Sequence, residues 1–284
     1  MTKLDLRVRA IGKKWLWIQA TLAFAFLYLP ILILIIYSFN TSKFNSIWRG
    51  FTLDWYRSLF SDVGTLGMAS SSSAGIWTAL NNSLLIATIS TLLATVLGTA
   101  IALALERFHF PGRKAVETLL FLPIIMPEIT IGISLLVFFT LVFRILENLT
   151  GIRLNLGLPT VIIGHVTFNI SFVTITVRAR LAELDPILEQ AAFDLGANEW
   201  RTFWRITLPL IWPSVFSGAL LAFTLSLDDF VVTFFTTGVG SMTLPLFVYG
   251  MIKFAVTPAI NALSTLMLLA SLLLVLSSLR MKKS

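Results

Sequence analysis

Long apolar runs separated by short polar stretches dominate the sequence. A helix needs about 20 apolar residues to cross the hydrocarbon core of a bilayer, because only a helix satisfies all of its backbone polar groups within one segment. Six runs meet or approach this length. They predict an all-α integral membrane protein with six transmembrane helices in one domain covering residues 1–284. The predicted spans are residues 15–39, 79–105, 116–143, 161–177, 213–235 and 262–279.

The composition agrees with a membrane protein. Hydrophobic residues make up 57% of the chain and charged residues only 12%, whereas about a quarter of an ordinary soluble domain is charged. The chain has no cysteine, which excludes disulfides, thiolate metal sites and thiol nucleophiles. The net charge of +7 does not indicate nucleic-acid binding, because basic residues collect in the loops on one side of a multispanning protein.

The basic residues also predict the orientation. Fifteen of the 21 Lys and Arg residues lie on one side of the six spans, in the two termini and in the loops after the second and fourth spans. Loops rich in Lys and Arg stay in the cytoplasm. Both termini and the segment 185–209 are therefore predicted to be cytoplasmic. The apolar stretch at 244–254, flanked by prolines, is too short to cross and is predicted to be a helix at the outer face.

The segment 185–209 is polar and helix-prone. Asp185, followed by a proline, favours a helix start, and Gly196 favours a helix end in the left-handed conformation. Asn198 favours the start of a second helix, which Pro209 is predicted to end before the fifth span begins. Two short helices that meet at a glycine and join two spans suit a lever that a soluble partner moves. The alternative is a plain helical hairpin against the membrane.

This segment resembles the signature loop of ABC-importer permeases, the membrane subunits of binding-protein-dependent transport systems. The family pattern is Glu-Ala-Ala, three residues, Gly, nine residues, Ile, any residue and Leu-Pro. The matching positions are Gln190, Ala191, Ala192, Gly196, Ile206, Leu208 and Pro209. The resemblance implies the type I importer permease fold and a short helix that docks on an ATPase subunit. The implied coupling residues are Glu189, Gln190, Ala191, Ala192, Asp194, Gly196 and Ala197.

The chain departs from the family pattern at Gln190, where the family usually has glutamate. The neighbouring Glu189 offers a carboxylate, but consecutive helical residues point about 100° apart. The departure leaves open how this helix meets its partner.

Nearly the whole chain resembles the spermidine/putrescine branch of the family, and specifically the second of its two permeases. The stretches that carry this resemblance are 122–128, 178–185, 194–197, 222–230, 243–246 and 258–264. Relatives that handle opines, iron or other solutes look similar, so the cargo stays open between polyamines and these solutes. The resemblance also implies a bacterial inner-membrane location.

The resemblance implies three kinds of partner: a homologous second permease, an ATP-binding ATPase dimer and an external solute-binding protein. The sequence contains no Gly-x-x-x-x-Gly-Lys-Ser/Thr run, so no nucleotide site is predicted in this chain. ATP and Mg²⁺ are expected in the partner ATPase, and this chain is expected to hold no cofactor or metal and no catalytic residue.

Acidic residues inside apolar runs are the candidate pathway residues. Asp228 and Asp229 lie in the predicted fifth span and Glu128 in the third, where a carboxylate costs several kcal/mol unless it faces water, protein or a cation. Because neighbours on a helix diverge, one aspartate is expected to line the pathway and the other to bond a neighbouring helix. Phe230 offers a π face to an ammonium group. Structural hydrogen bonds and packing are the alternatives for all four residues.

A second hypothesis is an ion-coupled secondary transporter in which Asp228, Asp229 or Glu128 carries a proton or coupling ion. His165, the lone histidine of the fourth span, is predicted to be a packed or hydrogen-bonded residue. A membrane enzyme is disfavoured because no catalytic constellation is found in the sequence.

Overall fold

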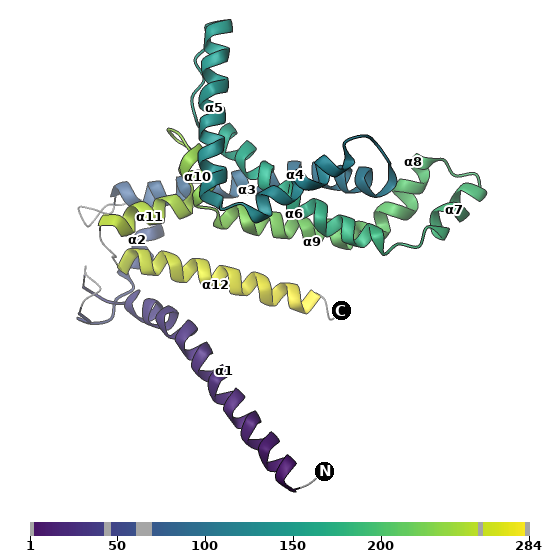
Figure 1. Cartoon of the computed structure of the whole chain (residues 1–284). Helices are drawn as coiled ribbons and strands as arrows, with labels where there is room; N and C mark the ends of the chain where they lie inside the picture. Colours follow the sequence, from purple (N-terminus) through teal and green to yellow (C-terminus); the bar gives the residue numbers. More distant parts are fainter. Residues whose placement is uncertain (1–2, 43–46, 61–69, 255–257, 282–284) are drawn as a thin grey trace. The chain divides into compact units, whose positions relative to one another are not determined.

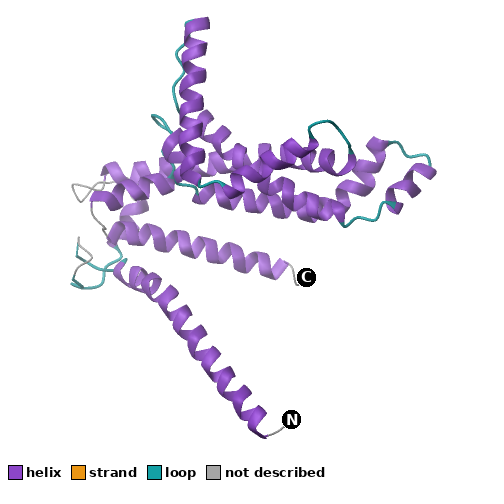
Figure 2. Cartoon of the chain, in the orientation of Figure 1, coloured by secondary structure: helices purple, strands orange, loops and turns teal. Residues whose placement is uncertain are grey.

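The computed structural model describes residues 3–42, 47–60, 70–254 and 258–281, and all regular elements in these ranges are helices (Figures 1 and 2). The chain divides into two compact units, one of Met1–Ala74 with Val248–Ser284 and the other of Gly75–Phe247. The helices are α1 (Lys3–Tyr37), α2 (Asp54–Phe60), α3 (Ser70–Arg107), α4 (Arg113–Ile125), α5 (Glu128–Thr150), α6 (Leu158–Ala182), α7 (Ile187–Asp194), α8 (Glu199–Thr202), the π-helical turn η1 (Phe203–Thr207), α9 (Leu208–Asp228), α10 (Val231–Thr236), α11 (Leu244–Phe254) and α12 (Pro258–Met281).

Among the described residues, five helical stretches are long and apolar enough to cross a membrane. They are Lys14–Tyr37, Gly75–Arg107, Glu128–Thr150, Leu158–Ala182 and Glu199–Asp228. The predicted sixth span is present as α12, but the apolar stretch defined there by described residues, Pro258–Leu269, is shorter than a span. The all-helical membrane fold is therefore confirmed, whereas the length and apolar character of the described helices give five spans and not the predicted six.

The predicted third span, residues 116–143, is wrong because the chain is broken inside it. Helix α4 ends at Ile125, and Met126 and Pro127 adopt extended backbone conformations before α5 begins. Proline disfavours a helical conformation in the residue before it, so Pro127 accounts for the break. Figure 1 shows α4 and α5 running in different directions.

The predicted fifth span, residues 213–235, is also wrong at both ends. Helix α9 begins at Leu208, and it ends at Asp228, where Asp229 takes an extended conformation with ψ of 125°. A separate six-residue helix, α10, follows after Phe230. The apolar character continues across this break, so a hydropathy window does not detect it.

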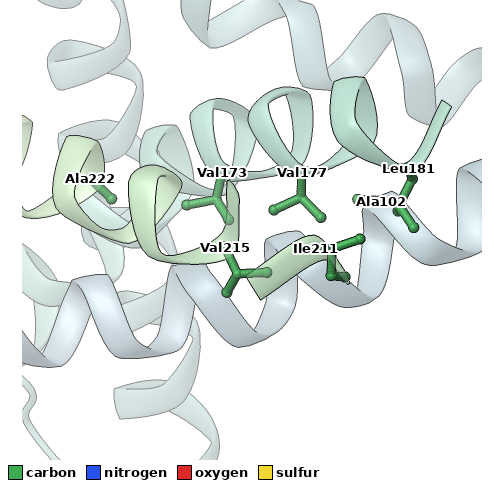
Figure 3. Packing of buried hydrophobic residues seen from close by; sticks show 7 residues of the cluster. All are labelled: Ala102, Val173, Val177, Leu181, Ile211, Val215 and Ala222. Carbon is green, nitrogen blue, oxygen red and sulfur yellow. The ribbon is translucent and has the colours of Figure 1, made fainter. Parts of the chain in front are cut away.

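Helices α3, α6 and α9 of the second unit enclose an apolar core (Figure 3). Its buried residues are Ala102, Val173, Val177, Leu181, Ile211, Val215 and Ala222. A second cluster joins α5, α6 and α10 through Ile131, Phe168 and Val232. The two clusters hold successive parts of α6 against different neighbours, and the break between α9 and α10 lies beside the second one.

A glycine lets α3 approach α6 closely. A Cβ atom added to Gly98 would lie 2.9 Å from the Cβ of Val173, which is closer than carbon atoms pack. Beside this contact, the hydroxyl of Thr174 donates to the carbonyl of Gly98 at 3.2 Å. Small residues and side-chain hydrogen bonds of this kind hold membrane helices together where the hydrophobic effect is weak.

In the first unit, α12 packs against α1 and α2. Asn40, just after α1, is fully buried and organises the loop that leads to α2. Its Nδ2 donates to the carbonyl of Ile47 at 2.8 Å, and its Oδ1 accepts from the Arg49 amide at 3.0 Å. The indole of Trp55 donates to the Asn40 carbonyl at 2.8 Å. The loop is therefore held by a buried polar side chain together with an isolated antiparallel bridge between Asn40 and Phe51.

Candidate functional site

The segment predicted to couple to a partner forms the helical hairpin α7–α8. The Asp185 carboxylate accepts from the Ile187 amide at 2.9 Å at the start of α7. At its end, Gly196 has φ of +81°, and the amides of Gly196 and Ala197 donate to the carbonyls of Phe193 and Ala192, each at 2.9 Å. This is a Schellman motif. The predicted left-handed glycine at position 196 is confirmed.

The second arm of the hairpin is continuous with α9. Asn198 caps α8 through its Oδ1, which accepts from the Arg201 amide at 2.9 Å, as predicted. The helical backbone then passes through the π-turn, where the Leu208 amide donates to the Phe203 carbonyl. The prediction that Pro209 ends this helix is wrong, because proline is tolerated in the first turn of a helix and its missing amide falls next to the π-turn. A displacement of α8 therefore moves α9 directly.

Glu189 points inward, toward the rest of the second unit. Both of its carboxylate oxygens contact the guanidinium of Arg107, the last residue of α3. The hydroxyl of Thr207, in the π-turn, also donates to Glu189 Oε1 at 2.5 Å. The Glu189 side chain is only 13% exposed. It does not stand in for the missing family carboxylate at position 190, because it is engaged within its own chain.

The remaining residues of the α7 motif divide between inside and outside. Ala192 is buried and Ala197 half-buried, whereas Gln190, Ala191, Asp194 and Gly196 are exposed. Large apolar side chains are exposed beside them. These are Ile187, Leu188, Phe193, Leu195, Trp200 and Trp204. An apolar surface of this kind on a short helical hairpin is suited to contact with another protein.

Asp229 lies at the break between α9 and α10 and bonds to the first turn of α10. Its Oδ2 accepts from the amide and from the hydroxyl of Thr233, each at 2.8 Å, and its Oδ1 accepts from the Val232 amide at 3.3 Å. Nε2 of His165, on α6, lies 3.2 Å from Oδ2. The Asp229 side chain is only 6% exposed. These donors offset the cost of burying the carboxylate, and two of them are backbone amides that the break in the helix leaves free.

The cluster extends from His165 to α3. Nδ1 of His165 lies 2.6 Å from the Ser226 hydroxyl, which lies 3.1 Å from the hydroxyl of Ser90. Nε2 also lies 2.9 Å from the Thr233 hydroxyl. With its hydrogen on Nε2, the ring donates toward the Asp229 carboxylate and the Thr233 oxygen, and Nδ1 accepts from Ser226. This buried polar cluster joins α3, α6, α9 and α10. His165 is the eighth residue of α6, so the cluster lies about 10 Å along the helix from its start.

Serine, histidine and aspartate in contact have the order of a hydrolytic triad, but their environment does not suit one. Ser226 is buried, and its hydroxyl is already bonded on both sides, to His165 and to Ser90. A nucleophile requires access to a substrate carbon. The prediction that His165 is a packed, hydrogen-bonded residue is confirmed.

Asp228 differs from Asp229 in its surroundings. It is the last residue of α9 and is exposed, and within the described parts of the chain its carboxylate has no hydrogen-bond or ion-pair partner. Phe230 is half-buried, with its ring 5.8 Å from that of Phe234. Glu128, the first residue of α5, is exposed on a different helix. The structure therefore brings Asp228 and Phe230 to one break and leaves Glu128 at another.

Several residues that shape these two sites were not singled out in the sequence. Arg107, Thr207, Ser90, Ser226 and Thr233 are all common residue types without a local motif. The one signal that pointed to the break was the pair of adjacent carboxylates within an apolar run. Their partners come from helices that are distant in sequence, so only the tertiary structure identifies them.

The fold is that of the membrane subunit of a bacterial ABC importer. The structure is similar to a chain in the crystal structure of a bacterial ABC transporter involved in the import of the acidic polysaccharide alginate, with a TM-score of 0.75 and 20% identity over 99% of this chain and 98% of that one. The same transporter in complex with alginate pentasaccharide-bound periplasmic protein gives a TM-score of 0.67 and 20% identity over 94% of this chain and 93% of that one.

The chain belongs to the family described as binding-protein-dependent transport system inner membrane component, whose model matches residues 94–283. It is 41% identical over 255 residues to the putrescine transport system permease protein PotI of Escherichia coli (strain K12), covering 89% of this chain and 85% of PotI. It is 40% identical over 245 residues to the spermidine/putrescine transport system permease protein PotC of the same strain, covering 86% and 85%. The predicted family and its polyamine branch are confirmed as the chain's relatives.

Proposed function

We propose that this chain is a membrane-spanning subunit of an ATP-driven importer and that its cargo is a polyamine, putrescine or spermidine. The observation that carries the proposal is the 40–41% identity to two permeases named for these compounds, over 85% of their lengths. The chemistry at the α9–α10 break agrees with a cationic cargo.

Asp228 is the carboxylate proposed to meet the cargo. It is exposed, unlike Asp229, which is occupied by Thr233 and His165. A carboxylate at membrane depth is stabilised by water, by protein donors or by a passing cation. The ring of Phe230, two residues along the chain, offers its face to an ammonium group. The break between α9 and α10 thus supplies both a charge and an aromatic surface.

The driving force is proposed to enter through α7 and its exposed apolar neighbours. A partner ATPase dimer holds ATP and Mg²⁺ in this proposal, because the sequence lacks a phosphate-binding loop. Gln190, Ala191 and Asp194 are exposed and face that partner, while Glu189 holds α7 against α3. This proposal keeps the predicted cytoplasmic location of both termini and of the hairpin.

Two further partners complete the assembly. A homologous second permease is proposed to share the pathway, so that the exposed side chain of Asp228 faces the space between the two permeases. A solute-binding protein is proposed to deliver cargo on the opposite side, where α11 lies in the predicted topology. The start of α11 is held to α3 in the second unit, since the Leu244 amide donates to Ser83 Oγ at 2.8 Å.

The test is uptake of radiolabelled putrescine and spermidine by proteoliposomes that contain the complete complex. We expect uptake that requires the solute-binding protein, ATP and an active ATPase. Uptake of an opine or of chelated iron in place of the polyamines would contradict the cargo. Uptake by this chain alone, driven by an ion gradient without ATP, would contradict the class and favour a secondary transporter.

A further inference from the structure

The C-terminal end of α3 carries two adjacent residues of opposite charge that bond in different directions. Arg107 binds Glu189 of α7, as described above. Glu106 binds Arg178 of α6, with Nε 3.3 Å from Oε2, and Arg178 also binds Glu117 of α4 at 2.9 Å. Consecutive helical residues diverge by about 100°, so these neighbours serve separate partners. The end of α3 is therefore a junction of α4, α6 and α7.

The Arg107–Glu189 pair differs from ordinary surface ion pairs, which contribute little. Both carboxylate oxygens contact the guanidinium, and the Thr207 hydroxyl binds the same carboxylate. A bidentate contact between arginine and a carboxylate fixes the relative orientation of the two groups as well as their distance. Since the Glu189 side chain is only 13% exposed, water competes weakly for it. The pair therefore fixes α7 in one orientation against α3.

This contact supplies a connection that the covalent chain lacks. The hairpin joins α6 and α9 directly, at residues 183–186 and through the π-turn. Helix α3 has no such covalent connection to α7, because α4, α5 and α6 lie between them in sequence. Without the ion pair, a displacement of α7 would reach the end of α3 only indirectly, through the contacts of α3 with α6 and α9.

Helix α3 also reaches the buried polar cluster at the α9–α10 break. Ser90 contacts Ser226, which contacts His165, the neighbour of Asp229. Seventeen residues separate Ser90 from Arg107, which corresponds to about 25 Å of helix. One continuous helix thus joins the residue that holds α7 to the cluster that holds the break.

We infer that Arg107 and Glu189 are positioning residues that carry the displacement of α7 to α3, and through α3 to the α9–α10 break. The inference rests on the proposed function, because it assumes that an ATPase moves α7. Movement of α6 and α9, which are covalently joined to the hairpin, is then insufficient to couple ATP hydrolysis to uptake. Loss of the pair should therefore separate ATP hydrolysis from uptake while leaving the complex assembled.

The experiment measures polyamine uptake per ATP hydrolysed in proteoliposomes of the complete complex. Arg107→Gln and Glu189→Gln are each expected to lower this ratio about fivefold or more, the size of a typical coupling between two sites. The charge-reversed double variant, Arg107→Glu with Glu189→Arg, is expected to recover a large part of it. Glu183→Gln is the matched control, because it removes an exposed carboxylate that pairs with Arg180 only three residues away.

Wild-type ratios in assembled Arg107→Gln and Glu189→Gln complexes would overturn the inference. If either single variant fails to assemble, the double variant decides: recovered coupling supports the inference, and an assembled but uncoupled complex overturns it. Uptake by the wild-type complex tells failure of this inference apart from failure of the proposed function. Absence of ATP-dependent polyamine uptake there would remove the proposed function itself, before any variant is compared.

Discussion

Nε2 of His165 lies 3.2 Å from Oδ2 of Asp229, and both side chains are buried at the break between α9 and α10. The contact joins α6, which starts at Leu158, to a break 64 residues after His165 in the chain. It gives Asp229 a structural environment that its neighbour Asp228 does not share. These adjacent aspartates therefore have different surroundings, and we expect them to have different roles.

Asp228→Asn is expected to weaken polyamine uptake without lowering the amount of folded protein. The carboxylate is exposed and has no partner in the described parts of the chain, so its loss removes a charge available to the cargo but no internal bond. The measurement is the apparent affinity for putrescine in proteoliposomes, beside the yield of monodisperse complex. Asp228→Glu, which keeps the charge, is the control. Uptake by Asp228→Asn with wild-type affinity would contradict the proposed role.

Asp229→Ala is expected to destabilise the fold. The substitution leaves the amide and the hydroxyl of Thr233 without their carboxylate acceptor, and an orphaned buried donor costs about 1–3 kcal/mol. The measurement is thermal unfolding of the purified protein in detergent. Asp229→Asn should be milder, because its carbonyl still accepts from Thr233. A wild-type melting temperature for Asp229→Ala would contradict the bonding described for this residue.

A double-mutant cycle tests whether His165 acts through Asp229. His165→Ala and Asp229→Ala are expected to be non-additive, because each removes the same contact, with an interaction free energy of about 0.5–3 kcal/mol. The pair Thr167→Ala and Asp229→Ala is the control, since the Thr167 hydroxyl bonds only within its own helix. Additive effects of the His165 and Asp229 substitutions would show that the two side chains are energetically independent.

Gly196→Pro is expected to abolish uptake while leaving assembly with the partners partly intact. Proline fixes φ near −65°, whereas Gly196 has φ of +81°, and its amide donates to the Phe193 carbonyl. Gly196→Ala is the graded comparison: an added Cβ meets no atom within 4 Å, so it imposes only backbone strain of about 1–2 kcal/mol. Uptake is measured in vesicles with ATP. Undiminished uptake by Gly196→Pro would contradict a lever at this hairpin.

Local features of the fold were predictable because their causes lie within a few residues. The caps at Asp185 and Asn198, the left-handed Gly196 and the helix over 244–254 each follow from short-range chemistry, and the structure confirms them. The break at Asp229 was missed because apolar residues continue through it. The prediction that Pro209 ends a helix failed because a proline near a helix start is compatible with a continuous helix.

The candidate site was predictable only in part. The adjacent carboxylates and the signature loop stand out in the sequence, but the contacts that define them do not. Glu189 meets Arg107 across 82 residues, and His165 meets Ser226 across 61. Such pairs depend on how α3, α6 and α9 pack, and no local propensity encodes that packing. The orientation of Glu189 in particular leaves Gln190, and not a carboxylate, exposed at the position where the family has glutamate.

ATP hydrolysis in a partner subunit is proposed to drive transport through α7. The chain has no cysteine, so Gln190→Cys creates a single thiol on the exposed side of this helix, where a reducible crosslinker can reach the ATPase. We expect a crosslinked product of this chain with the ATPase in the native complex, with uptake that stops on crosslinking and recovers on reduction. Full ATP-driven uptake with the thiol accessible and no product formed would contradict it.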